Sequence, residues 1–118
     1  MNETTQSVKI GDIFEMSWGY DQTNVNFFQV TRLTLKGVYV REISMKSAGN
    51  EGFMCQNVVA TENVFLRRSQ WCGGFGDNNP ETFFKLKKES NGQPYFSVKG
   101  RYIACRWDKT PTYQSWYA

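Results

Sequence analysis

Residues 25–43 read VNFFQVTRLTLKGVYVREI, and this stretch decides the fold. Its first part, Val25–Leu35, alternates in part between apolar and polar side chains, which is typical of a half-buried strand. Lys36-Gly37 follows, and Val38–Ile43 is rich in β-branched and aromatic residues. Two such runs separated by a short turn that contains Gly predict an antiparallel β-hairpin.

Further short strands are expected on both sides of this hairpin, because apolar runs recur between turn-forming residues. They are Ile13–Trp18, Thr82–Leu86, Tyr95–Val98 and Tyr102–Trp107. Phe53–Phe65 is expected to form one bent strand or two short ones, whereas the composition of Ser44–Gly52 and Arg67–Pro80 predicts loops, the second long and exposed. The sequence therefore predicts an all-β fold, either a small barrel or a strongly curved antiparallel sheet of about six short strands.

The length of 118 residues, 40% of them hydrophobic, is enough for one core. Residues 1–7 are polar and are expected to be disordered, with residues 8–118 forming a single β domain. No apolar run is long enough to span a membrane, and the first residues lack the pattern of an export signal. The three cysteines, Cys55, Cys72 and Cys105, lack C-x-x-C spacing, so reduced thiols in a cytoplasmic protein are expected.

The chain contains no histidine. The commonest general base at neutral pH and the commonest metal ligand are therefore both missing, along with every Ser-His or Cys-His mechanism. Cys72 is expected to be exposed, with Arg67 and Arg68 near enough in sequence to lower the pKa of its thiol, but no imidazole is present to activate it. We expect a non-enzymatic binding protein without a cofactor or a metal.

Positive charge and aromatic residues gather in the C-terminal half. Residues 59–118 carry nine Lys/Arg against five Asp/Glu, whereas residues 1–58 carry five against six. Single-stranded nucleic acid is bound by such a mixture, because bases stack on aromatic rings while cations follow the phosphates. Aromatic residues are also the main core material of small β domains, and for most of them that is the favoured interpretation. Those in loop or tail sequence, Trp71, Phe75, Tyr113 and Trp116, are the ones expected to be exposed.

Two stretches carry a family resemblance: residues 17–30, SWGYDQTNVNFFQV, and residues 106–118, RWDKTPTYQSWYA. Together they resemble a group of small proteins carried by bacteriophages and other mobile elements. The resemblance implies a protein that engages a host protein or nucleoprotein complex, for example as an inhibitor of CRISPR or another defence system, or that binds nucleic acid. Where that group usually has Asp-Gly after the tryptophan, this chain has Asp108-Lys109.

The two stretches also suggest a place for the site. The runs Tyr20–Asn24 and Trp107–Pro111 are expected to meet, either as one polar-aromatic surface or as a buried corner in which Asp and Asn cap turns. The alternative function is a small-molecule or nucleotide-binding β-barrel with Asp21 and Asn24 lining its pocket. The candidate binding residues are Trp18, Tyr20, Asp21, Asn24, Arg67, Arg68, Trp71, Phe75, Trp107, Asp108, Tyr113 and Trp116.

Overall fold

The hairpin at the centre of the chain forms as expected in the computed structural model. Strand β2 (Asn24–Leu33) pairs with β3 (Gly37–Gly52) in antiparallel register, with Val30 opposite Val40. Thr34 closes the turn, because its hydroxyl oxygen accepts the backbone N–H groups of Lys36 and Gly37. Glycine is required at position 37, since a Cβ there would lie 2.2 Å from the Phe84 carbonyl oxygen of β5.

The structure describes residues 8–19, 24–52, 55–72, 76, 78–110 and 112–115, although the side chains of 49–52, 55, 56 and 113–115 lie outside the description. Within these residues every element is a strand, and nine strands form one antiparallel sheet. The all-β prediction is confirmed, whereas the expected number of about six strands was too low. Residues 1–7, expected to be disordered, lie outside the described part. No segment of the described chain forms a helix with the length and apolar character that crossing a bilayer requires.

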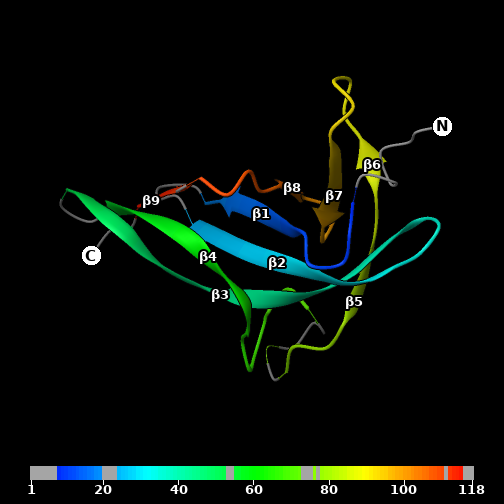
Figure 1. The fold of residues 1–118 in the computed structure, drawn as a ribbon, viewed down its shortest axis with the longest axis horizontal. Helices are drawn as coiled ribbons and strands as arrows, with labels where there is room; N and C mark the ends of the chain where they lie inside the picture. Colours follow the sequence, from blue (N-terminus) through cyan, green and yellow to red (C-terminus); the bar gives the residue numbers. More distant parts are fainter. Residues whose placement is uncertain are drawn as a thin grey trace.

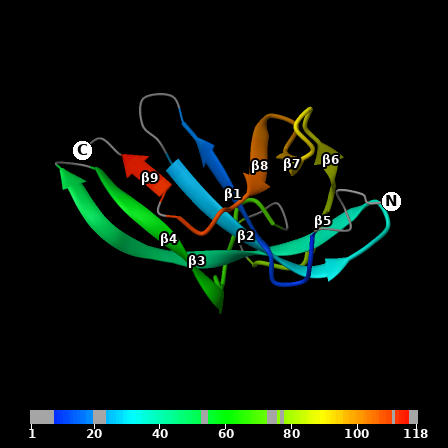
Figure 2. The same cartoon turned by 45° about the horizontal axis from the view of Figure 1, so that its top comes forward.

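The sheet has the order β6-β7-β8-β1-β2-β3-β4-β9, with β5 paired to the outer edge of β3. The remaining strands are β1 (Ile13–Trp18), β4 (Cys55–Phe65), β5 (Thr82–Lys85), β6 (Lys87–Lys88), β7 (Pro94–Val98), β8 (Tyr102–Arg106) and β9 (Thr112–Ser115). A single residue, Leu86, separates β5, which pairs with β3, from β6, which pairs with β7. The sheet therefore curls strongly without closing into a continuous barrel, and the two groups of edge strands lie at opposite ends of the molecule (Figures 1 and 2).

Apolar side chains from the two faces of the sheet form two separate cores, because successive residues of a strand point to opposite faces. Phe14 of β1 lies in the large core and its neighbour Ile13 in the small core. The large core consists of Val8, Phe14, Met16, Phe28, Val30, Val38, Val40, Trp71, Cys72, Leu86, Phe96, Val98 and Ala104. The small core consists of Ile13, Val25, Phe27, Ile43 and Val58.

Two expectations about the strands were wrong. Ser44–Gly52 is not a loop but the second half of β3, paired with β4 through a register that shifts three times. These irregularities explain why the sequence shows no alternation there, since backbone hydrogen bonds hold the pair while the side chains change face. The tail residues Thr112–Ser115 form a strand that was not expected, β9, which pairs with residues 55–58 of β4.

Candidate nucleic-acid interface

The segment expected to be a long exposed loop, residues 67–80, is tied down to β3. The Ser69 hydroxyl donates a hydrogen bond to the Glu42 carboxylate and accepts the backbone N–H groups of Trp71 and Cys72, both at 3.1 Å. The Asn79 amide donates to the carbonyl oxygens of Glu42 and Leu66, each at 2.8 Å. The prediction that Trp71 is exposed was therefore wrong: only 8% of its surface is accessible, because the loop returns it to the large core.

Trp18 belongs to the same buried region. Its indole N–H donates to Asn26, whose amide donates in turn to Glu42, both at 2.7 Å. Burial raises the pKa of the Glu42 carboxyl above its ordinary value, against the lowering effect of the hydrogen bonds from Ser69 and Asn26. Trp18 also packs edge-on against Trp71, with 5.3 Å between ring centroids. This network fastens a loop to the sheet and leaves little aromatic surface there for a ligand.

Cys72 is fully buried, against the expectation that it is the exposed thiol. Burial raises the pKa of this thiol, in the opposite direction from the expected lowering by Arg67 and Arg68. Both arginines are exposed. Arg68, together with Asn26, Glu42 and Trp71, contributes to the lining of a shallow pocket of about 340 Å³.

The side chains of Trp107 and Asp108 contact other residues of the protein. The Trp107 ring packs on Phe27 with 5.3 Å between centroids, and its indole N–H donates to the Thr110 carbonyl oxygen. Asp108 accepts the backbone N–H of Thr110 in the same turn, and the hydrogen bonds from Thr110 lower the pKa of its carboxyl. These hydrogen bonds stabilise a local turn whose residues Asp108 and Thr110 are exposed.

Of the first run, Tyr20–Asn24, only Asn24 is among the described residues. Trp18, which precedes the first run, packs on the large core, whereas Trp107 packs on the small core, on the opposite face of the sheet. Asn24 lies opposite Trp18 in the β1–β2 ladder and has a polar partner of its own. The other predicted site residues, Tyr20, Asp21, Phe75, Trp116 and the side chain of Tyr113, lie outside the described residues.

The positive charge of the chain is concentrated in β5–β8. Residues 82–106 carry six Lys/Arg and one acidic residue, Glu89, whereas the rest of the chain carries eight Lys/Arg and ten Asp/Glu. This short segment thus has a net charge of +5 in a protein whose total is +3, and the remainder is −2. Its strands β6, β7 and β8 form one antiparallel unit at one end of the sheet, whereas β5 pairs with β3 (Figure 1).

The outward side of this unit combines lysines with an aromatic ring and an exposed apolar side chain. Phe84 and Leu86 point inward to the large core, so Lys85 and Lys87 point outward on alternate positions. Lys87 lies directly opposite Tyr95 of β7. Ile103 of β8 is 44% exposed. Lys88, at the next position of β6, lies opposite Pro94 and lines the adjoining pocket together with Tyr95 and Ile103. We call Lys85, Lys87, Lys88, Tyr95 and Ile103 the lysine–tyrosine face.

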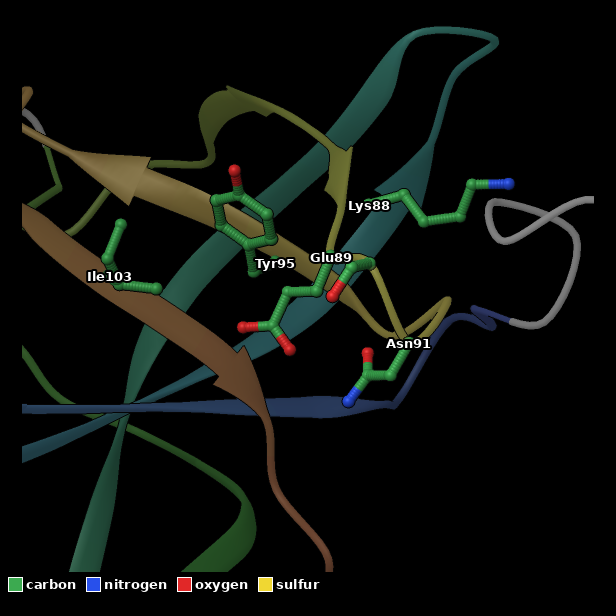
Figure 3. A pocket seen from close by; sticks show the side chains of 6 residues that line it. Lys88, Glu89, Asn91, Tyr95 and Ile103 are labelled. Atoms are coloured by element: carbon green, nitrogen blue, oxygen red, sulfur yellow. The ribbon is translucent and has the colours of Figure 1, made fainter.

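The lysine–tyrosine face borders a pocket of about 530 Å³. Lys88, Tyr95 and Ile103 line it from three strands. Glu89, Ser90 and Asn91, from the turn between β6 and β7, complete the lining. In Figure 3 the Tyr95 ring lies against the hollow, with the Glu89 carboxylate beside it and Asn91 further along the turn.

Sequence reasoning found this segment but not its outward residues. All four of Lys85, Lys87, Lys88 and Tyr95 lie in the C-terminal half, where basic and aromatic residues gather. Trp71 rather than Tyr95 was expected to be exposed, because Trp71 lies in loop sequence and loop residues are usually exposed. The alternation of Lys85, Leu86 and Lys87 is the signal that could have found them.

Comparisons add no known relative. The chain matches no protein-family model, no curated protein and no solved structure. Among the described side chains, no group of three or more metal-ligating residues comes together. The geometry of the lysine–tyrosine face is therefore the basis for the functional argument.

Proposed function

We propose that the protein is a non-enzymatic binding protein for single-stranded nucleic acid, and that it binds through the lysine–tyrosine face. The observation that carries the proposal is the pairing of Lys87, which lies between Lys85 and Lys88 in sequence, with the outward Tyr95, in a segment of net charge +5 within a chain that is otherwise negative. Such local charge attracts a polyanion, even where the net charge of the whole protein is small.

The partner class follows from the pairing of cations with a ring. Tyr95 and Lys87 are side by side on one face, so a base that stacks on the ring brings its phosphate within reach of the ammonium group. Phe83, 42% exposed on β5, is a further aromatic side chain at the surface of this segment, and its ring packs edge-on against Tyr39. In a duplex the faces of the bases are stacked on one another, so this arrangement favours a single strand.

The resemblance of residues 17–30 and 106–118 to phage-borne proteins suggests the setting in which such binding acts. A phage or mobile-element protein that holds single-stranded nucleic acid in the host cytoplasm suits both replication and interference with host defence. A host nucleoprotein complex that exposes single-stranded nucleic acid would present the same chemistry.

A second candidate is small-molecule binding at the pocket beside Glu42. The observation in its favour is that Trp71 Nε1, although buried, has no hydrogen-bond partner in the structure. The first proposal is preferred because this nitrogen has almost no accessible surface, and the neighbouring polar groups already satisfy one another.

The test is a binding titration by fluorescence anisotropy, with labelled oligothymidine, oligouridine and a duplex of the same length. We expect both single strands to bind more tightly than the duplex. Three phosphate contacts, from Lys85, Lys87 and Lys88, give a slope of about −2 for log K against log salt. The triple variant K85Q/K87Q/K88Q should lose this slope.

The matched control is K9Q/K46Q/K109Q, which removes the same charge from exposed lysines elsewhere. It should retain most of the affinity and the slope. If both triple variants lose the same affinity, the nucleic acid is attracted by the net charge of the protein and not by the lysine–tyrosine face. Binding that does not respond to salt would instead favour the pocket beside Glu42.

A further inference from the structure

Glu89, the one acidic residue among residues 82–106, lines the pocket that borders the lysine–tyrosine face. Glu89 is exposed at the start of the turn between β6 and β7, and its backbone accepts and donates the hydrogen bonds that close this turn. A carboxylate in a surface that binds phosphates reduces affinity by charge repulsion. Attraction of the phosphate backbone of a nucleic acid therefore does not explain why Glu89 lies here.

The side chain of Glu89 is available to a ligand. Its described side-chain contact is with the Cys105 thiol, 3.9 Å from Oε2, a weak donor at long range. The salt bridges Arg32–Glu81 and Arg106–Asp12 do not involve it. In Figure 3 the carboxylate lies next to the Tyr95 ring, at the edge of the surface on which a base would stack.

A carboxylate offers two acceptor oxygens side by side and therefore selects a partner with two adjacent donors. Among the five common bases of DNA and RNA, guanine alone presents two adjacent N–H donors, N1–H and N2–H, on its Watson–Crick edge. Adenine and cytosine place a ring acceptor beside the amino group, and thymine and uracil flank their N–H with carbonyl oxygens. These acceptors would face the carboxylate and repel it.

The neighbouring asparagine complements the same base. The Asn91 side-chain oxygen accepts the backbone N–H of Gln93 at 3.0 Å, which directs the amide nitrogen away from the turn. An amide N–H is a donor, and the guanine edge continues with the O6 acceptor beside N1–H. Guanine thus matches all three side chains: it can stack on Tyr95, donate two hydrogen bonds to Glu89 and accept one from Asn91.

We propose that this pocket holds one unpaired guanine, stacked on Tyr95 and recognised by the Glu89 carboxylate. The inference rests on the proposed function, because the phosphates on either side of the base are held by the lysines of the lysine–tyrosine face. It goes beyond that function by giving the protein a preference among single strands.

The experiment uses oligothymidine with one central thymine replaced by guanine, adenine or cytosine, titrated against the full-length protein and the variant E89Q. For the wild type we expect the strand with guanine to bind at least about five-fold more tightly than the other three. For E89Q the four affinities should agree within about two-fold, because an amide offers one acceptor in place of two. Glu62→Gln, at an exposed position on β4, is the matched control and should keep the preference.

The outcomes separate the two proposals. If the wild type binds all four strands equally, with salt dependence intact, the guanine site is wrong and the nucleic-acid function stands. Retention of the guanine preference by E89Q would also overturn the site. If no strand binds, the proposed function itself fails.

Discussion

Lys87 and Tyr95 are directly opposed in the β6–β7 ladder, so a cation and an aromatic ring stand side by side on the outward face of the sheet. Opposed residues of an antiparallel pair have their Cβ atoms about 5 Å apart. That spacing lets one nucleotide contact both side chains, with its base on the ring and its phosphate at the ammonium group. The account of function depends on this pair.

Replacing Tyr95 by alanine should weaken binding of single-stranded nucleic acid. A stacked base contributes about 1–3 kcal/mol, so the dissociation constant should rise by about five-fold or more. Tyr95→Phe keeps the ring and should retain most of the affinity. Anisotropy titrations of both variants check this, and equal losses for Ala and Phe would show that the hydroxyl group, rather than stacking, matters.

The raised pKa of Glu42 predicts a pH-dependent stability. The folded protein holds this proton more tightly than the unfolded chain, whose carboxyl titrates near 4.5. The contribution of Glu42 to stability is therefore fully present below that pH and is lost as pH rises through the folded pKa. Relative to Glu42→Gln, the wild type should lose up to about 1.4 kcal/mol of unfolding free energy per pH unit in this window.

Urea denaturation of the wild type and E42Q at several pH values measures this difference. Glu62→Gln, at an exposed position, is the control and should run parallel to the wild type. A wild type that gains stability relative to E42Q as pH rises would mean that the hydrogen bonds from Ser69 and Asn26 outweigh desolvation.

Phe96 should be among the side chains on which stability depends most. It is fully buried, stacks on Phe84 at 4.7 Å between centroids and also contacts Phe14 and Phe28. Phe96→Ala should therefore cost about 3–5 kcal/mol. Phe83→Ala, on the exposed side of the same region, should cost less than about 1.5 kcal/mol, and thermal denaturation compares the two.

Asn79 should anchor the loop without contributing to binding. Its side chain is buried and satisfies the backbone N–H and C=O of Glu42 as well as the Leu66 carbonyl. Asn79→Ala removes these three hydrogen bonds, although the Glu42 carbonyl still accepts the Leu66 N–H, and should cost about 2–4 kcal/mol, whereas the exposed Asn78→Ala should be nearly neutral. Under conditions where the variant is folded, its affinity for oligothymidine should equal that of the wild type; a selective loss of binding would place the loop in the site.

The parts of the fold that local pattern determines were predictable. Alternation and turn chemistry identified the strand Ile13–Trp18, the hairpin over residues 25–43 and the strand Tyr95–Val98, and the structure confirms all three. The second half of β3 was not predictable, because its bulges remove the alternation that reveals a strand.

The buried polar network was beyond local reasoning for a different reason. Glu42 is bonded to Asn26, Ser69 and Asn79, which are 16, 27 and 37 positions away in the chain. No periodic signal reports such contacts, so the loop around Trp71 was predicted to be exposed. Composition also failed to distinguish the aromatic residues of the C-terminal half that are buried, such as Phe96, from those that point outward, such as Tyr95.

The most direct test of the account is an NMR titration of the isotope-labelled protein with oligothymidine, following the backbone amide signals. We predict that the largest shifts fall on β5–β8, at Lys85, Lys87, Tyr95 and Ile103, and that those of the small core and β9 barely move. Shifts centred on the loop around Trp71 or on Trp107, or no shifts at all, would contradict binding at the lysine–tyrosine face.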